Sequence, residues 1–227
     1  VGIMVLYPIR KRLYLSSGEG KNAKFEYAAK VCSLARTVSA CGTCSFLYRK
    51  TTLIVDTQFE KIPAHDVVGI RVILSSEDLP ELFKRGYAEV KKFLRLEGIE
   101  PKGPARAYYF GDVSDTVDIL IGFPVSPAQA ESLRRGALSQ SGGDIDDVVL
   151  HHFRDMKTMH SRHSGPFDGV ERVWDEILDE VEDLGCTLPS SSIGWEEYIE
   201  GPATADTCDQ LATEVYVQVC QAPVKTA

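Results

Sequence analysis

One order of elements, a strand, a helix and two further strands, occurs twice within residues 57–220, and this repeat constrains the fold more than any other feature. In the first copy, a β-branched run at 67–74 predicts a strand. Apolar residues then recur at helical spacing and predict a helix at 77–97 that ends near Gly98. The strands that complete this copy are predicted at 105–110 and 117–125.

The second copy follows a segment at 126–147 that is rich in Gly and Ser, contains Pro, and is interpreted as a linker. A strand with a bulge is predicted at 148–159, and an amphipathic helix is predicted at 167–184. Gly185 stands where a helix C-cap glycine belongs. The closing strands of this copy are predicted at 194–200 and 213–220.

Two matching copies predict a pseudo-twofold arrangement with a cleft where the copies meet. The expected fold class is α/β (α+β), in which duplicated strand-helix-strand-strand units form one antiparallel sheet with two helices on one side. Three segments are expected along the chain: a basic N-terminal extension of unknown structure at 1–56, a ligand-binding domain at 57–220 and a C-terminal tail at 221–227.

The charge of the chain changes sign near the first boundary. Residues 1–52 carry nine basic and two acidic side chains, a net of +7, whereas residues 53–227 carry sixteen basic and thirty-one acidic side chains, a net of −15. So abrupt a shift supports a boundary near residues 50–57. The net charge of −8 for the whole chain argues against nucleic acid as a direct partner. An acidic surface attracts cations instead.

The cysteines and histidines do not predict a metal site or a cofactor. Cys41 and Cys44 form one C-x-x-C pair, but no second pair lies nearby to complete a zinc site. They are interpreted as structural or incidental thiols, with redox and metal roles as the alternatives. No apolar run is long enough to predict a membrane span. No secretion signal is recognised, so the expected location is cytoplasmic.

Alternation along the closing strands predicts a polar and aromatic face. Glu214 and Tyr216 share one side of their strand, and the intervening valines suit the side covered by the helices. Glu196 and Tyr198 alternate in the same way on the preceding strand. Such a face can receive a flat cation, because each ring face attracts it by about 0.5–2 kcal/mol. The candidate ligand-binding residues are Glu196, Tyr198, Glu214, Tyr216, Asp118, Tyr109 and Trp195.

The alternative for these residues is an ordinary structural role. Acidic strand residues are often solvated, and a tyrosine such as Tyr198 is as readily a packing residue as a ligand contact. Trp174 lies in the apolar stripe of the second predicted helix and is assigned to the core.

The residues also carry a family resemblance. Residues 160–168 read H-S-R-H-S-G-P-F-D and are similar to the H-x-G-P-[YF]-D signature of the GyrI-like small-molecule-binding domain family. Other segments resemble further parts of that family, in the family's order, across residues 57–220. They lie at 61–65, 69–71, 100–105, 108–109, 195–198, 201–202 and 213–215.

The resemblance implies a duplicated strand-helix-strand-strand fold with an open concave sheet. It implies a role as the effector-binding domain of multidrug-responsive regulators, as a gyrase inhibitor, or as a free-standing binder of cationic or aromatic compounds. Some members hydrolyse cyclopropane-bearing alkylating toxins. In this family, acidic residues in the concave cleft, on the last strands, contact the ligand. Residues 1–52 match nothing in it, and the 126–147 linker is longer than the family's pattern.

Two function classes follow, of which the binding module is favoured. In the first, the chain is a small-molecule-binding protein for cationic or planar aromatic compounds, acting as a monomer or dimer. In the second, it is a hydrolase in which Glu196 or Glu214 is the general base and Tyr198 orients substrate or water. A partner-binding scaffold, a third class, would need an exposed apolar patch.

Overall fold

The computed structural model describes residues 56–111, 115–136, 148–202 and 204–221. Nearly all of the predicted N-terminal extension, the centre of the predicted linker and most of the predicted C-terminal tail therefore lie outside the described residues. Cys41 and Cys44 lie outside them too. The two domain boundaries stay predictions.

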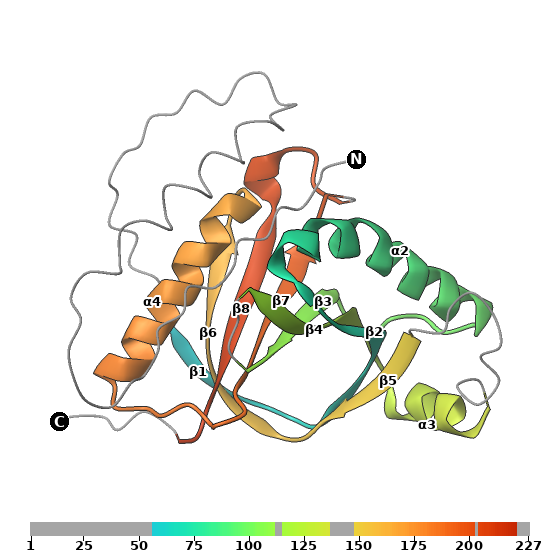
Figure 1. Cartoon of the computed structure of the whole chain (residues 1–227), viewed down its shortest axis with the longest axis horizontal. Helices are drawn as coiled ribbons and strands as arrows, with labels where there is room; N and C mark the ends of the chain where they lie inside the picture. Colours follow the sequence, from blue (N-terminus) through green and yellow to red (C-terminus); the bar gives the residue numbers. More distant parts are fainter. Residues whose placement is uncertain (1–55, 112–114, 137–147, 203, 222–227) are drawn as a thin grey trace. The chain divides into compact units, whose positions relative to one another are not determined.

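All eight described strands belong to one antiparallel sheet (Figure 1). Their order across the sheet is β1-β6-β8-β7-β3-β4-β2-β5. Their bounds are β1 Gln58–Ile62, β2 His65–Ser75, β3 Ala105–Phe110, β4 Thr116–Val125, β5 Val148–Phe153, β6 Met156–Ser164, β7 Ile193–Glu200 and β8 Ala212–Val219.

Within the described residues, three α-helices pack on this sheet: α2 (Leu79–Leu96), α3 (Pro127–Arg135) and α4 (Val170–Asp183). Helix α2 lies against β2 and β4, and α4 lies against β6 and β8, so each half of the sheet carries one long helix (Figure 1). Short 3-10 turns, η2 (Ser76–Asp78) and η3 (Phe167–Gly169), lead into α2 and α4, and η4 (Cys208–Gln210) precedes β8. The predicted fold class is confirmed.

Helix α3 lies inside the segment that the sequence analysis interprets as a linker. Ser126 accepts a hydrogen bond from the backbone N–H of Gln129, and the Gln129 side chain accepts one from the backbone N–H of Ser126. Pro127 occupies the first turn, where its missing N–H costs nothing. This capping box is readable in the sequence, so the linker interpretation is wrong for residues 127–135, and the part at 137–147 lies outside the described residues.

The two copies of the repeat meet at the centre of the sheet, where β3 pairs with β7. Each copy also has an additional first strand that is exchanged with the other copy. Strand β1 leads directly into β2 but pairs with β6, and β5 leads into β6 but pairs with β2. The two connecting links touch, because the backbone N–H of Ala64 donates to Asp155 Oδ1 at 2.8 Å. The predicted strand at 148–159 is therefore two strands, separated at residues 154–155.

The sheet has two different faces. The helix face carries alternate residues such as Ile119, Val215 and Val217, which pack with α2 and α4 in the main core. The far face carries the other set, including Tyr108 and Trp195, in a second apolar cluster.

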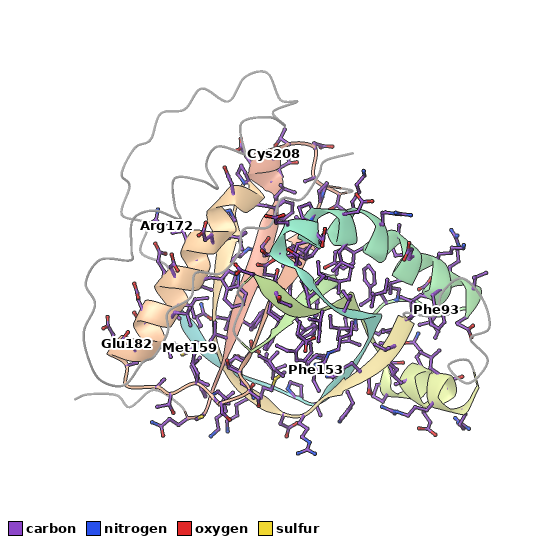
Figure 2. All side chains as sticks on the ribbon, in the orientation of Figure 1. Phe93, Phe153, Met159, Arg172, Glu182 and Cys208 are labelled. Atoms are coloured by element: carbon purple, nitrogen blue, oxygen red, sulfur yellow. The ribbon has the colours of Figure 1, made fainter. Side chains whose placement is uncertain are left out.

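The sheet curls toward its far face. Strands β3 and β5 are three places apart in the sheet, which would separate them by about 14 Å if it were flat. The rings of Tyr108 and Phe153 nevertheless stack with their centroids 4.2 Å apart. Phe153 is labelled in Figure 2, near the links that join β1 to β2 and β5 to β6. The predicted concave sheet is confirmed, and its concave side is filled by side chains of the far face.

Candidate functional site

The register of β7 and β8 decides which predicted site residues lie together. Glu196 pairs with Val215, and Glu197 pairs with Glu214. Because paired residues of neighbouring strands point to the same side of a sheet, Glu196 and Glu214 lie on opposite faces. The predicted residues on the helix face are Glu196, Tyr198 and Tyr109. Those on the far face are Glu214, Tyr216, Asp118 and Trp195.

The helix-face group surrounds a buried carboxylate. Glu196 is only 3% exposed, yet both of its oxygens have hydrogen-bond donors. Trp174 Nε1, from α4, donates to Oε1 at 2.8 Å. The Tyr198 hydroxyl donates to Oε2 at 2.5 Å. The carboxylate is therefore held in a fixed position by one donor from the helix and one from its own strand.

Aromatic rings pack around the two donors to this carboxylate, Tyr198 and Trp174. The ring of Tyr198 makes edge-on contacts with Phe83 and Tyr87 of α2 and with Phe167 of η3, at centroid distances of 6.5, 6.2 and 5.8 Å. The rings of Tyr109 and Trp174 meet edge-on at 5.9 Å. We call this set the Glu196 site. It comprises Glu196, Tyr198, Tyr109, Trp174, Phe83, Tyr87 and Phe167.

No described cationic side chain pairs with Glu196. Burial raises the pKa of Glu196, because a buried charge loses its hydration, and the hydrogen bonds from Tyr198 and Trp174 oppose that rise. Burial also raises the pKa of Tyr87, Tyr109 and Tyr198 well above the ordinary value, and the nearby Glu196 charge adds to the effect. The phenols therefore stay protonated, and those of Tyr198 and Tyr87 donate to Glu196 Oε2 and to the carbonyl oxygen of Arg106, respectively. The carboxylate has no counter-ion among the described residues.

Gly194 gives Trp174 its place beside Glu196. A Cβ added at Gly194 would lie 2.5 Å from one carbon of the indole ring and 2.6 Å from another. The absence of a side chain on β7 therefore allows the indole to lie close to the strand and donate to the carboxylate two residues further along. Trp174 is buried, as predicted for a core residue, but its hydrogen bond to Glu196 is not part of that prediction.

The far-face acids, in contrast, all have cationic partners. Asp118 forms two hydrogen bonds with Arg71, at 3.1 and 3.0 Å. Glu214 lies 3.4 Å from His160 Nδ1 and 3.7 Å from Arg162 Nη1. Their charges are compensated within the protein, so none of them needs a cation from outside.

Glu197, which the sequence analysis did not select, has a cationic partner too. Arg106 Nη2 lies 3.0 Å from Glu197 Oε1, which also accepts from Trp195 Nε1 at 3.1 Å. Arg106 Nη1 donates to the Tyr108 hydroxyl at 3.0 Å. This buried network joins β3 to β7 at the centre of the sheet.

The far-face rings form a stack across neighbouring strands. Centroid distances are 4.9 Å from His160 to Tyr216, 4.6 Å from Tyr216 to Trp195 and 5.6 Å from Trp195 to Tyr108. Tyr108 then stacks on Phe153. These rings pack mainly on one another, so Tyr216 and Trp195 serve the core of the concave side.

The described residues show no cluster of three His, Cys, Asp or Glu side chains that could hold a metal ion. The three cysteines within the described ranges, Cys186, Cys208 and Cys220, are free thiols. No described helix is both long enough and apolar enough to cross a membrane.

Comparison with known proteins gives likeness at the level of structure. No known family profile matches the sequence, and no curated protein matches it either. EcmrR, in the cryo-EM structure of the EcmrR-DNA complex in EcmrR-RPo, superposes with a TM-score of 0.57 at 18% identity, over 73% of this chain. This chain spans 57% of that EcmrR chain.

Two further structures extend the likeness over whole domains. The EcmrR C-terminal domain superposes with a TM-score of 0.54 at 14% identity, over 75% of this chain and all of that domain. SAV2435 bound to tetraphenylphosphonium superposes with a TM-score of 0.52 at 14% identity, over 72% of this chain and 93% of SAV2435. At these identities the likeness shows the fold.

Proposed function

We propose that this chain, which has the fold of GyrI-like small-molecule-binding domains, binds organic cations at the Glu196 site. The observation that carries the proposal is a buried carboxylate without a cationic partner among the described residues, whose two donors pack against aromatic rings. A buried charge is costly unless it is paired. An organic cation would supply the missing charge, and its apolar groups would replace water against the rings.

The surroundings of Glu196 suit a lipophilic cation better than a metal ion. Ring faces attract a cation by about 0.5–2 kcal/mol each, and the attraction of a carboxylate for it is stronger in a dry site than in water. SAV2435, which shares the fold, was solved with the lipophilic cation tetraphenylphosphonium. Tetraphenylphosphonium is therefore the natural first probe.

Entry of such a ligand requires the enclosing side chains to move. Glu196 is almost completely buried, and Trp174 and Tyr198 occupy both of its oxygens. A ligand must displace a neighbour such as the Trp174 indole, which α4 carries. Rearrangement of side chains on binding is common for closed sites.

The test is titration of tetraphenylphosphonium into the wild-type protein and matched carboxylate variants. We expect Glu196→Gln to weaken binding by about 10–100-fold, as loss of a charged contact worth roughly 1.5–3 kcal/mol implies. Glu200→Gln is the matched control, because Glu200 is an exposed carboxylate on the same strand. Equal loss in both variants, or no loss in either, would refute the site.

Hydrolysis of reactive, cyclopropane-type toxic compounds is the second candidate function. The Glu196–Tyr198 hydrogen bond favours it, since a carboxylate with a raised pKa and a fixed hydroxyl can take a proton from an attacking water. Glu214 suits the role of base less well, because His160 and Arg162 lie beside it. In this case Glu196→Gln abolishes turnover of a cyclopropane-bearing substrate and retains much of the binding.

The remaining expectations belong to the same proposal. A binding protein of this kind acts on a small molecule, without direct nucleic-acid contact, as a monomer or dimer in the cytoplasm. Light scattering and a DNA-binding titration test these points separately from the ligand.

A further inference from the structure

The helix face of β8 carries one polar residue among valines. Val215, Val217 and Val219 face the main core, and Thr213 occupies the same side at the start of the strand. Thr213 is 1% exposed, and its hydroxyl oxygen is buried without a hydrogen-bond partner among the described residues. A valine would have almost the same shape there and no polar atom to satisfy.

Thr213 lies directly beside the Glu196 site. It pairs with Tyr198 on β7, whose hydroxyl donates to Glu196, and with His163 on β6. The Thr213 row is two residues along the strands from the row that contains Glu196 and Val215. At 3.2–3.4 Å per residue along the strands and about 4.8 Å between neighbouring strands, the Cα atoms of Glu196 and Thr213 are about 8 Å apart.

The side chains of the two residues that pair with Thr213, Tyr198 and His163, already have hydrogen-bond partners. The Tyr198 hydroxyl donates to Glu196 Oε2, and His163 Nε2 lies 2.7 Å from the carbonyl oxygen of Pro166. Buried polar groups nearly always have partners, and one that lacks a partner needs an explanation, such as a water or ion bound there or a role in function. The Thr213 hydroxyl is thus a second polar feature on the helix face, separate from the carboxylate.

We propose that Thr213 hydrogen-bonds the ligand whose positive charge Glu196 neutralises. This inference rests on the proposed cation-binding function and narrows the ligand class. The ligand is an amine or quaternary ammonium compound with an oxygen function, a hydroxyl, ether or carbonyl, within about 8 Å of its charged nitrogen. A cation whose other groups are all hydrocarbon neutralises the Glu196 carboxylate but gives the Thr213 hydroxyl no hydrogen-bond partner.

Two ammonium ions that differ by one hydroxyl test the inference. Phenethyl trimethylammonium and its para-hydroxyl derivative carry the same charge and ring, and the derivative places an oxygen at a comparable separation from nitrogen. We expect the hydroxylated ion to bind the wild-type protein roughly tenfold more tightly, the effect of one neutral hydrogen bond made in a buried site. In Thr213→Val this preference should disappear, with little change in affinity for the ion that lacks the hydroxyl.

Two further variants keep the test independent of folding. Thr213→Ser retains the hydroxyl and should retain the preference. Thr158→Val is the control, because Thr158 is a fully buried threonine whose hydroxyl donates to the carbonyl oxygen of Glu60, on the far face. This variant should lose stability and keep the preference.

The outcomes separate this inference from the proposed function. If both ions bind, depend on Glu196 and show no preference, or show one that survives Thr213→Val, the role of Thr213 is refuted and cation binding stands. If neither ion binds and tetraphenylphosphonium does not bind either, the proposed function fails and the inference fails with it.

Discussion

Glu196 and Glu197 are adjacent in sequence and lie on opposite faces of one strand, where their surroundings differ. Glu197 has Arg106 at 3.0 Å as a counter-ion, within a network that joins the two halves of the sheet. Glu196 has only neutral donors, Trp174 and Tyr198. The difference supports the proposal that Glu197 serves the fold, whereas Glu196, which has no cationic partner among the described residues, would gain one from a ligand.

The largest expected effect comes from breaking the Arg106–Glu197 pair. The two side chains are 16% and 10% exposed, so Glu197→Ala leaves a largely buried guanidinium without its counter-ion. We expect a loss of about 3 kcal/mol in the free energy of unfolding. Glu196→Gln should change that free energy by less than about 1 kcal/mol. Urea unfolding of both variants measures the contrast, and equal losses would contradict it.

The next effect concerns the position of Trp174. In Gly194→Ala the new methyl group would overlap the indole, so Trp174 must move and its bond to Glu196 is weakened. We expect a loss of about 1–3 kcal/mol in stability, as for overpacking elsewhere, with a change in tryptophan fluorescence. Gly201→Ala serves as the control, because nothing lies within 4 Å of a Cβ at that position. An unchanged fluorescence spectrum in Gly194→Ala would show that the indole does not depend on this glycine.

Affinity for a permanently charged cation should depend on pH through Glu196. Burial raises its pKa above the ordinary 4.5, so tetraphenylphosphonium should bind more tightly as pH rises through that raised pKa and the carboxylate ionises. Stability should change in the opposite direction. A raised carboxyl pKa contributes stability below pH 4.5, and this is lost as pH rises through the folded-state pKa. Both trends should vanish in Glu196→Gln, and their persistence there would assign them to another group.

The smallest effect is expected from His160 on the far face. The hydrogen bond with Glu214 raises the pKa of His160, against the opposing effect of burial. Protonated His160 therefore contributes stability that is fully present below pH 6.5 and is lost as pH rises through its folded-state pKa. His160→Gln should remove this slope without changing the affinity for tetraphenylphosphonium, as thermal unfolding and titration at several pH values would show.

The sequence predicts most of the fold, because a period-two or helical pattern survives in nearly every element. Helix α4 and strand β8 lie close to their predicted bounds. The periodic pattern does not predict that β1 pairs with a strand of the second copy and β5 with a strand of the first. Strand partners depend on contacts between residues that are distant in the sequence. The short break at residues 154–155 carries no strong turn signal, so β5 and β6 were predicted as one strand.

The site was predicted less completely, and register is the physical reason. Alternation orders residues within a strand, but it does not fix which face of one strand matches which face of the next. Glu196 and Glu214 were therefore placed together on pattern alone, whereas pairing of Glu196 with Val215 separates them. The helical segments add three more rings to the site, those of Phe83, Tyr87 and Phe167. In the sequence, these residues follow the apolar pattern of a helix and therefore predict only a role in the core.

Comparison of two ions of the same shape and opposite charge tests the central claim most directly. Tetraphenylphosphonium and tetraphenylborate expose similar apolar surfaces, so calorimetric titration of each isolates the contribution of charge. The uncompensated carboxylate of Glu196 predicts clear binding of the phosphonium, little binding of the borate, and a much smaller difference in Glu196→Gln. Equal affinity of the wild-type protein for the two ions would contradict the account.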